Sequence, residues 1–151
     1  MNASKHGVTG MALSSEEVKA FMDYLEDAIP VKGKVHKDGK EVTDTSIRDA
    51  DVYYIEHEAE NLYEILQKVA QMVNLYFKYD LTGIEKAQIL HYKAPSNGYT
   101  YHIDLDSSEK SISRKVSVTI VLNDGYEGGE ICFRTSETGT CQRPTAGFFF
   151  F

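Results

Sequence analysis

Two segments in the first half of the chain repeat hydrophobic residues at the spacing of an amphipathic helix. The first starts at Ser14 or Ser15, where Ser14 and Glu17 have the spacing of a capping box, and it ends before Pro30. The second is longer, and we expect its apolar stripe to pack against a sheet. The residues of this stripe are Leu62, Ile65, Leu66, Val69, Met72, Val73, Tyr76 and Phe77.

Extended structure is expected between these two helices. Asp38-Gly39 lies between Val35 and Val42 and predicts a short hairpin, because this dipeptide favours the turn that joins two antiparallel strands. Residues 51–55 have the composition of a strand. The stretch around these elements is polar and rich in turn-forming residues.

The hydrophobic pattern changes from helical to extended after Gly83. Short runs of strand composition follow one another, separated by clusters of Pro, Asn, Asp and Gly, with no helical segment between them. We therefore predict a single α+β domain, 1–151, in which a helical N-terminal part (1–82) packs on an antiparallel sandwich or jelly-roll part (83–151). The predicted strands of this second part are residues 86–92, 99–105, 114–122, 130–134 and 147–151.

Composition and charge narrow the classes of protein. The 151 residues are 42% hydrophobic and 26% charged, as is typical of globular domains. No apolar stretch approaches the roughly 20 residues that cross a bilayer, and residues 1–14 lack the apolar core of a secretory signal, so we expect no membrane partner. The net charge of −7 argues against a nucleic-acid partner. Cys132 and Cys141 are the two cysteines of the sequence, and we expect free thiols in a cytoplasmic protein, with a hairpin disulfide as the alternative.

His102 and Asp104 form the most informative candidate site. They are two positions apart in a run with strand composition, and side chains at such positions leave the same face of a strand. Two histidines and one carboxylate on one face of an iron(II) ion are the ligands of many non-haem iron oxygenases. The pair therefore supplies two of these three ligands. The alternative is a pair that only hydrogen-bonds, in a β-sandwich without a metal.

The order of several segments around this pair has a counterpart in a known family. The segments are residues 46–48, 88–92, Gly98, 101–104, 114–123, 126–130 and 144–147. Together they resemble the 2-oxoglutarate- and iron(II)-dependent dioxygenases of the prolyl 4-hydroxylase type. This resemblance implies that the core of residues 83–151 is a double-stranded β-helix, which is a form of jelly roll. The resemblance covers about residues 43–151, which is most of the chain.

The resemblance implies an enzyme that hydroxylates a prolyl or similar side chain and releases succinate and carbon dioxide. The substrate would be a protein, a peptide or a small molecule. The implied cofactor is Fe(II) and the implied co-substrate is 2-oxoglutarate, with ascorbate as a further small molecule. In this family pattern His102 and Asp104 correspond to iron ligands, and Tyr92 corresponds to a tyrosine that lines the 2-oxoglutarate pocket.

The chain departs from the family pattern near its end. The family places a second histidine ligand downstream of the aspartate, followed by an Arg or Lys that binds the far carboxylate of 2-oxoglutarate. No histidine follows His102 in this sequence, and its last basic residue is Arg143. We therefore expect a jelly roll that is incomplete at the C-terminus, from a truncated member with weak or no activity. The alternatives are a catalytically inactive jelly-roll module that binds a partner and, for residues 148–151, a natural last strand of a minimal sheet.

Other residues fit the missing ligand position less well. His91 precedes Tyr92 on one predicted strand, so the two side chains face opposite ways. Asp106 would share the face of Asp104 only if that strand continued. Cys132 and Cys141 with His102 match no compact zinc-binding spacing.

Overall fold

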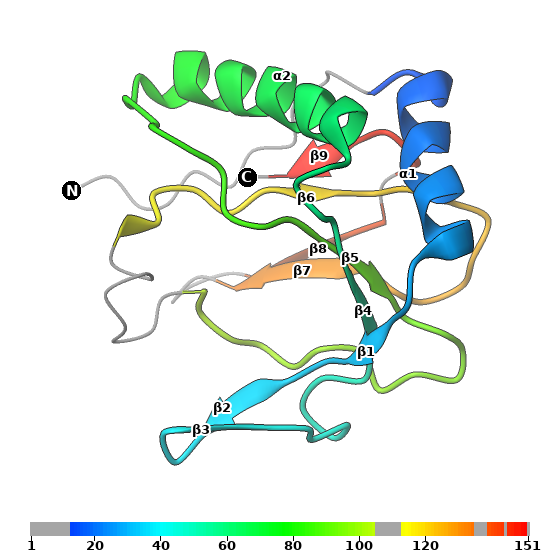
Figure 1. The fold of residues 1–151 in the computed structure, drawn as a ribbon. Coiled ribbons are helices and arrows are strands. Elements are labelled where there is room, and N and C mark those ends of the chain that lie inside the picture. The colour runs from blue at the N-terminus through cyan, green and yellow to red at the C-terminus, as the bar shows by residue number, and fades with distance from the viewer. Residues whose placement is uncertain (1–12, 105–112, 135–138, 144, 151) are drawn as a thin grey trace. The chain divides into compact units, whose positions relative to one another are not determined.

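The computed structural model describes residues 13–104, 113–134, 139–143 and 145–150 of an α+β chain (Figure 1). Its helices include α1 (Ser15–Asp27) and α2 (Glu60–Phe77). The chain falls into two compact units. One is the continuous stretch Asp23–Asp104, and the other combines Met1–Met22 with Leu105–Phe151. Both helices predicted from the sequence are confirmed.

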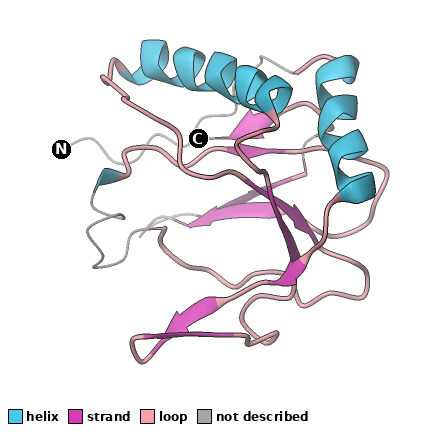
Figure 2. Cartoon of the chain, viewed as in Figure 1, coloured by secondary structure: helices cyan, strands magenta, loops and turns pink. Residues whose placement is uncertain are grey.

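The strands form small separate antiparallel sheets (Figure 2). One sheet has the order β1-β4-β5, and three pairs join β2 to β3, β6 to β9 and β7 to β8. The two helices and the antiparallel sheets confirm the α+β class. None of the sheets built from the described residues closes or curls, so a jelly roll is not shown. The strands are β1 (Val31–Lys32), β2 (Val35–Lys37), β3 (Lys40–Val42), β4 (Asp51–Tyr54), β5 (Gln88–His91), β6 (Thr119–Ile120), β7 (Ile131–Arg134), β8 (Gly139–Gln142) and β9 (Phe149–Phe150).

Local signals in the sequence explain the start of α1 and the β2–β3 hairpin. The amide of Ser14 donates to Glu17 Oε2 at 2.9 Å, and the amide of Glu17 donates to Ser14 Oγ at 3.2 Å. These reciprocal bonds are those of a capping box. Asp38 and Gly39 have φ angles of 52° and 74°, as the tight turn between two antiparallel strands requires. The predictions for both elements are confirmed.

The apolar stripe of α2 is buried along most of the helix. Its buried members are Leu62, Ile65, Val69 and Val73, whose spacing of three and four positions places them on one face. Tyr76, at the C-terminal end of the predicted stripe, is exposed instead. The helix ends where Lys78 adopts a left-handed conformation with φ of 56°. No helix in the described part of the chain has the length and apolar character needed to span a membrane.

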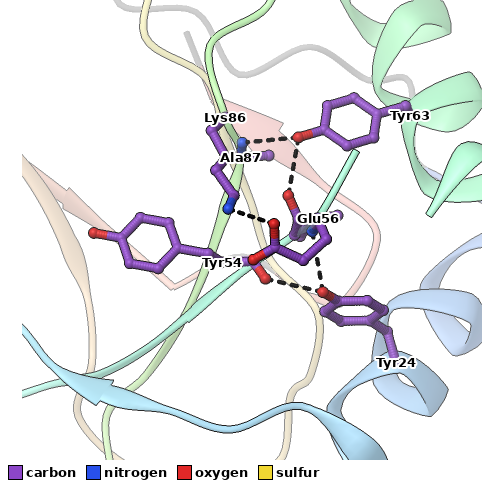
Figure 3. Close-up of polar contacts among 7 residues, drawn as sticks. Tyr24, Tyr54, Glu56, Tyr63, Lys86 and Ala87 are labelled. Carbon is purple, nitrogen blue, oxygen red and sulfur yellow. Dashed lines mark hydrogen bonds and ion pairs between the residues drawn. The ribbon is translucent and has the colours of Figure 1, made fainter. Parts of the chain in front are cut away.

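Two tyrosines hold the end of β4 in the Asp23–Asp104 unit (Figure 3). The Tyr24 hydroxyl donates to the carbonyl of Tyr54 at 2.9 Å and accepts from the amide of Glu56 at 3.1 Å. The Tyr63 hydroxyl donates to the carbonyl of Ile55 at 3.0 Å and accepts from the amide of Ala87 at 3.4 Å. These backbone groups lie at the end of β4, just past it and just before β5, so the hydroxyls satisfy polar groups at the edge of the pairing between the two strands.

In the other unit, backbone hydrogen bonds join residues from both ends of the described chain. The amide of Leu13 donates to the carbonyl of Gly147 at 2.7 Å, and the amide of Gly147 donates to the carbonyl of Val121 at 2.8 Å. Beside this junction β9 pairs with β6, and Phe149 is buried. The strand predicted for residues 147–151 is thus confirmed at its centre.

A disulfide joins Cys132 of β7 to Cys141 of β8. The two residues face each other in the register of this hairpin, with Cα atoms 4.0 Å apart. The expectation of free thiols is therefore wrong, because it rested on composition, which contains no information about cross-strand register. The alternative of a hairpin bridge is the one that the structure has.

The predicted strand 99–105 is wrong for its described part. Residues 100–104 are irregular, and Tyr99 forms only an isolated antiparallel bridge with Arg48. The run predicted as 114–122 forms a strand at β6 alone, and β8 has no counterpart in the prediction. A strand composition records what a side chain prefers, whereas a strand forms only where a partner offers its backbone.

Candidate functional site

His102 and Asp104 converge although they do not lie on a strand. His102 Nε2 is 3.2 Å from Asp104 Oδ1. The side chains keep 39% and 53% of their surface exposed. The prediction that the two groups point the same way is therefore met by an irregular segment in place of the expected strand.

The backbone of Thr100 orients the His102 ring. The Thr100 carbonyl oxygen lies 2.8 Å from His102 Nδ1. Because a carbonyl only accepts, Nδ1 carries the hydrogen of this bond, and Nε2 is the atom directed at Asp104. A hydrogen bond from the far ring nitrogen is the usual support of a metal-bound histidine, since it sets both the tautomer and the ring orientation.

The spacing of the two donor atoms fits neighbouring positions on one metal ion. Nitrogen and oxygen ligands lie about 2.1 Å from a small divalent metal, so two ligands at a right angle are about 3 Å apart. The Nε2–Oδ1 distance of 3.2 Å is close to this value. In the neutral tautomer with its hydrogen on Nδ1, Nε2 presents a lone pair toward Asp104 Oδ1, and a cation between the two atoms stabilises this arrangement. The donor set of one imidazole and one carboxylate suits iron(II).

A third ligand is not found in the described ranges. No group of three His, Cys, Asp or Glu side chains that would hold a metal occurs among these residues. His91 lies opposite Asp51 in the β4–β5 pairing, with an exposed side chain, and Asp106 is outside the described residues. The zinc alternative is wrong for Cys132 and Cys141, because their sulfur atoms are bonded to each other.

Aromatic and cationic groups flank the imidazole. The rings of Tyr99 and His102 are stacked, with centroids 3.7 Å apart and planes inclined by 18°. The Arg48 guanidinium carbon lies 5.0 Å from the centroid of the Tyr99 ring, within the range of a cation–π contact. Sequence reasoning names neither residue as part of the site. The resemblance of residues 46–48 includes Arg48 but gives it no role in the site. Two tyrosines precede His102, and spacing alone does not tell the stacked Tyr99 from Tyr101, which is 62% exposed.

Tyr92 lies beside Arg48. It follows β5 directly and is 38% exposed. Partial burial raises the pKa of its hydroxyl above the usual value of 10.0, and the charge of Arg48 opposes this shift. The predicted role of Tyr92 in a 2-oxoglutarate pocket stays a prediction. A shallow hollow of about 510 Å³ lies elsewhere, at the C-terminal end of α2, and is lined by Gln71, Asn74, Leu75, Lys78 and Tyr79.

Comparison with known proteins adds no assignment. No protein-family model, curated protein or solved structure matches the chain. An oriented imidazole nitrogen and a carboxylate oxygen at the spacing of adjacent ligands can bind a divalent metal and leave its other positions open.

Proposed function

We propose that this chain is a 2-oxoglutarate- and Fe(II)-dependent dioxygenase-type domain in which His102 and Asp104 hold two adjacent positions on the iron. The observation that carries the proposal is the 3.2 Å approach of His102 Nε2 to Asp104 Oδ1, with Nδ1 held by the Thr100 carbonyl. The segment order around the pair supports it by resemblance. In this proposal the strands of residues 83–151 belong to a jelly-roll core.

The residues of the site have separate tasks. The imidazole of His102 supplies a neutral donor, and the carboxylate of Asp104 offsets part of the metal charge. Iron(II), when bound, supplies the oxygen activation that a 2-oxoglutarate-dependent hydroxylation needs. Tyr92 lines the co-substrate pocket, and the substrate is a prolyl or similar side chain of a protein or peptide.

Weak metal binding and little turnover follow for this sequence. The described residues offer two ligands, His102 and Asp104, which leave at least one of the usual three positions to water or another donor. Added 2-oxoglutarate should strengthen binding, because a chelating co-substrate fills positions that the protein leaves open. Succinate formation with Fe(II) and ascorbate is expected to stay far below that of a working oxygenase.

The test is a titration with Mn(II), which takes the same ligands as Fe(II) without oxidising. Electron paramagnetic resonance of free Mn(II) gives the affinity with and without 2-oxoglutarate. We expect His102→Ala and Asp104→Ala each to weaken binding by at least about tenfold. His91→Ala is the matched control, since this exposed histidine should leave the affinity unchanged. Equal affinity of the wild type and His102→Ala would overturn the proposal.

A catalytically inactive jelly-roll module that binds a partner is the second candidate. It is favoured by the lack of a group of three metal-ligating side chains among the described residues. Calorimetry with Mn(II) plus 2-oxoglutarate distinguishes the two. No heat of binding from a chain that unfolds cooperatively supports the binding module. A β-sandwich in which the pair only hydrogen-bonds predicts in addition that His102→Ala changes no metal content.

A further inference from the structure

We infer that Tyr99 and Arg48 are positioning residues that hold the His102 imidazole with Nε2 directed at Asp104. The inference concerns the site of the proposed function and rests on that proposal for its catalytic meaning. The orientation of the His102 ring can be measured whether or not a metal binds.

The backbone next to Tyr99 is attached to the segment that precedes β4. The amide of Asp49 donates to the carbonyl of Gly98 at 2.8 Å, and the amide of Thr100 donates to the carbonyl of Ile47 at 2.9 Å. These bonds flank the Arg48–Tyr99 bridge. They place the Thr100 carbonyl, which is the group that accepts from His102 Nδ1.

Side chains reinforce the same attachment. Ser96 Oγ donates to the carbonyl of Asp49 at 2.8 Å, and the amide of Asn97 donates to Asp49 Oδ2 at 3.1 Å. The turn before Tyr99 is therefore bound to Asp49 through both backbone and side chain. Although residues 100–104 form no strand, their starting point is well defined.

Two contacts of different kind act on the imidazole. The Tyr99 ring covers a face of the ring at a centroid distance of 3.7 Å, and the Thr100 carbonyl accepts a hydrogen bond at its edge. A half-turn of the ring about its Cβ–Cγ bond would break the hydrogen bond from Nδ1, and a smaller rotation would also tilt the ring out of the stack. Together the contacts restrict His102 to the orientation that a metal ligand needs.

Arg48 in turn restrains Tyr99. Its guanidinium donates through Nη1 to the Lys34 carbonyl at 3.3 Å and through Nη2 to Gln88 Oε1 at 3.4 Å. The side chain also passes close to Gly33, where an added Cβ would lie 3.0 Å from Arg48 Cδ. Anchored at these points, Arg48 offers the Tyr99 ring a cation at 5.0 Å. The restraint on His102 thus extends to the segments before β2 and along β5.

Nuclear magnetic resonance of the full chain tests the ring orientation directly. Carbon-bound protons of the His102 ring, assigned by their loss in His102→Ala, should be shifted upfield because they lie over the Tyr99 ring. The shift should persist in Tyr99→Phe, disappear in Tyr99→Leu and diminish in Arg48→Met. Tyr101→Leu is the matched control, since that exposed tyrosine should leave the shift unchanged.

Mn(II) affinity is measured on the same proteins. We expect Tyr99→Leu to weaken it by about tenfold and Tyr99→Phe to keep it, because the stack and not the hydroxyl is required. A wild-type His102 ring without an upfield shift overturns the inference, and sequential assignment of the wild-type spectrum gives this result even if no variant folds. Unchanged affinity in Tyr99→Leu, in a protein that binds Mn(II), also overturns it. A shift that depends on Tyr99 in a chain without Mn(II) binding supports the positioning and overturns the proposed function instead.

Discussion

The hydroxyl of Tyr63 donates a 3.0 Å hydrogen bond to the carbonyl oxygen of Ile55, just past the end of β4. The same hydroxyl accepts from the amide of Ala87, so its loss leaves two partly buried backbone groups without this partner. We expect Tyr63→Phe to lower the free energy of unfolding by about 1–2 kcal/mol, as measured by urea denaturation.

Tyr24→Phe should lower the free energy of unfolding by less than Tyr63→Phe does. The Tyr24 hydroxyl also makes two hydrogen bonds to the backbone, but both are solvent-exposed, so water replaces the lost partner. Tyr53→Phe, in the same strand β4, is the control that should have almost no effect. An equal loss for all three variants would contradict the assigned role of the two hydroxyls.

Gly147 is expected to tolerate no side chain. Its φ is +87°, and a Cβ would lie 2.7 Å from the backbone oxygen of Leu13, which cannot move without disturbing the start of α1. We expect Gly147→Ala to destabilise the chain by on the order of 3 kcal/mol or more. Gly125→Ala is the matched control, because Gly125 has φ of +77° with nothing within 4 Å of the added Cβ. It should cost about 1–2 kcal/mol through backbone strain alone, and similar losses in a thermal melt would rule out the close contact.

Acid should lower the stability of the folded chain by protonating carboxylates that form ion pairs. A hydrogen bond from Lys32 lowers the pKa of Asp51 below the usual 3.8, and one from Arg143 lowers the pKa of Glu130 below the usual 4.5. A carboxyl group whose pKa is lower in the folded state contributes stability above its unfolded pKa and loses it as the pH falls through the folded value. We expect the unfolding midpoint to fall as the pH drops below about 4.5.

Asp51→Asn tests one of these contributions. The variant should be less stable than the wild type at neutral pH and should lose less stability on acidification. Glu58→Gln, which removes a carboxylate that forms no ion pair among the described residues, serves as the control. Because both paired groups are on the surface, 1 M salt should reduce the difference between Asp51→Asn and the wild type. A parallel pH dependence of the two proteins at low salt would show that the pair contributes nothing.

Reduction of the Cys132–Cys141 disulfide should destabilise the hairpin of β7 and β8. The disulfide closes a short loop, with a sequence separation of 9, and such a loop corresponds to about 2–3 kcal/mol of stabilisation. We expect a reducing agent to lower the unfolding midpoint of the wild type. The double variant Cys132→Ala/Cys141→Ala should start from the lower value and not respond. Two free thiols in the oxidised native protein, counted by alkylation and mass spectrometry, would refute the bridge.

Features that depend on neighbours in the chain were predictable from the sequence. The capping box of Ser14 and Glu17 and the turn at Asp38-Gly39 involve hydrogen bonds and backbone angles within a few residues, so composition and spacing suffice. The stripe of α2 follows from the period of the helix. The boundaries of the strands were less predictable, because they depend on which distant segment offers a backbone partner.

In the candidate site, too, contacts between residues near in the sequence were predictable and contacts between distant segments were not. His102 and Asp104 are close in the sequence, so their side chains can meet on several kinds of backbone, including the irregular one observed. Arg48 and Tyr99 meet only because the fold brings together segments that are far apart in the sequence. No local pattern marks that contact, and neither residue was predicted as part of the site.

The division of the chain into a continuous and a discontinuous unit has a consequence for its synthesis. The residues that contact the His102 ring, together with Arg48 and its anchors, belong to the continuous stretch Asp23–Asp104. On a ribosome these surroundings can assemble before the later residues emerge, since domains form as their residues become available. The amide of Leu13 is made before its acceptor, the carbonyl of Gly147, and cannot form this hydrogen bond until Gly147 has been added. We therefore expect a nascent chain to order the imidazole before it completes the junction between Leu13 and Gly147.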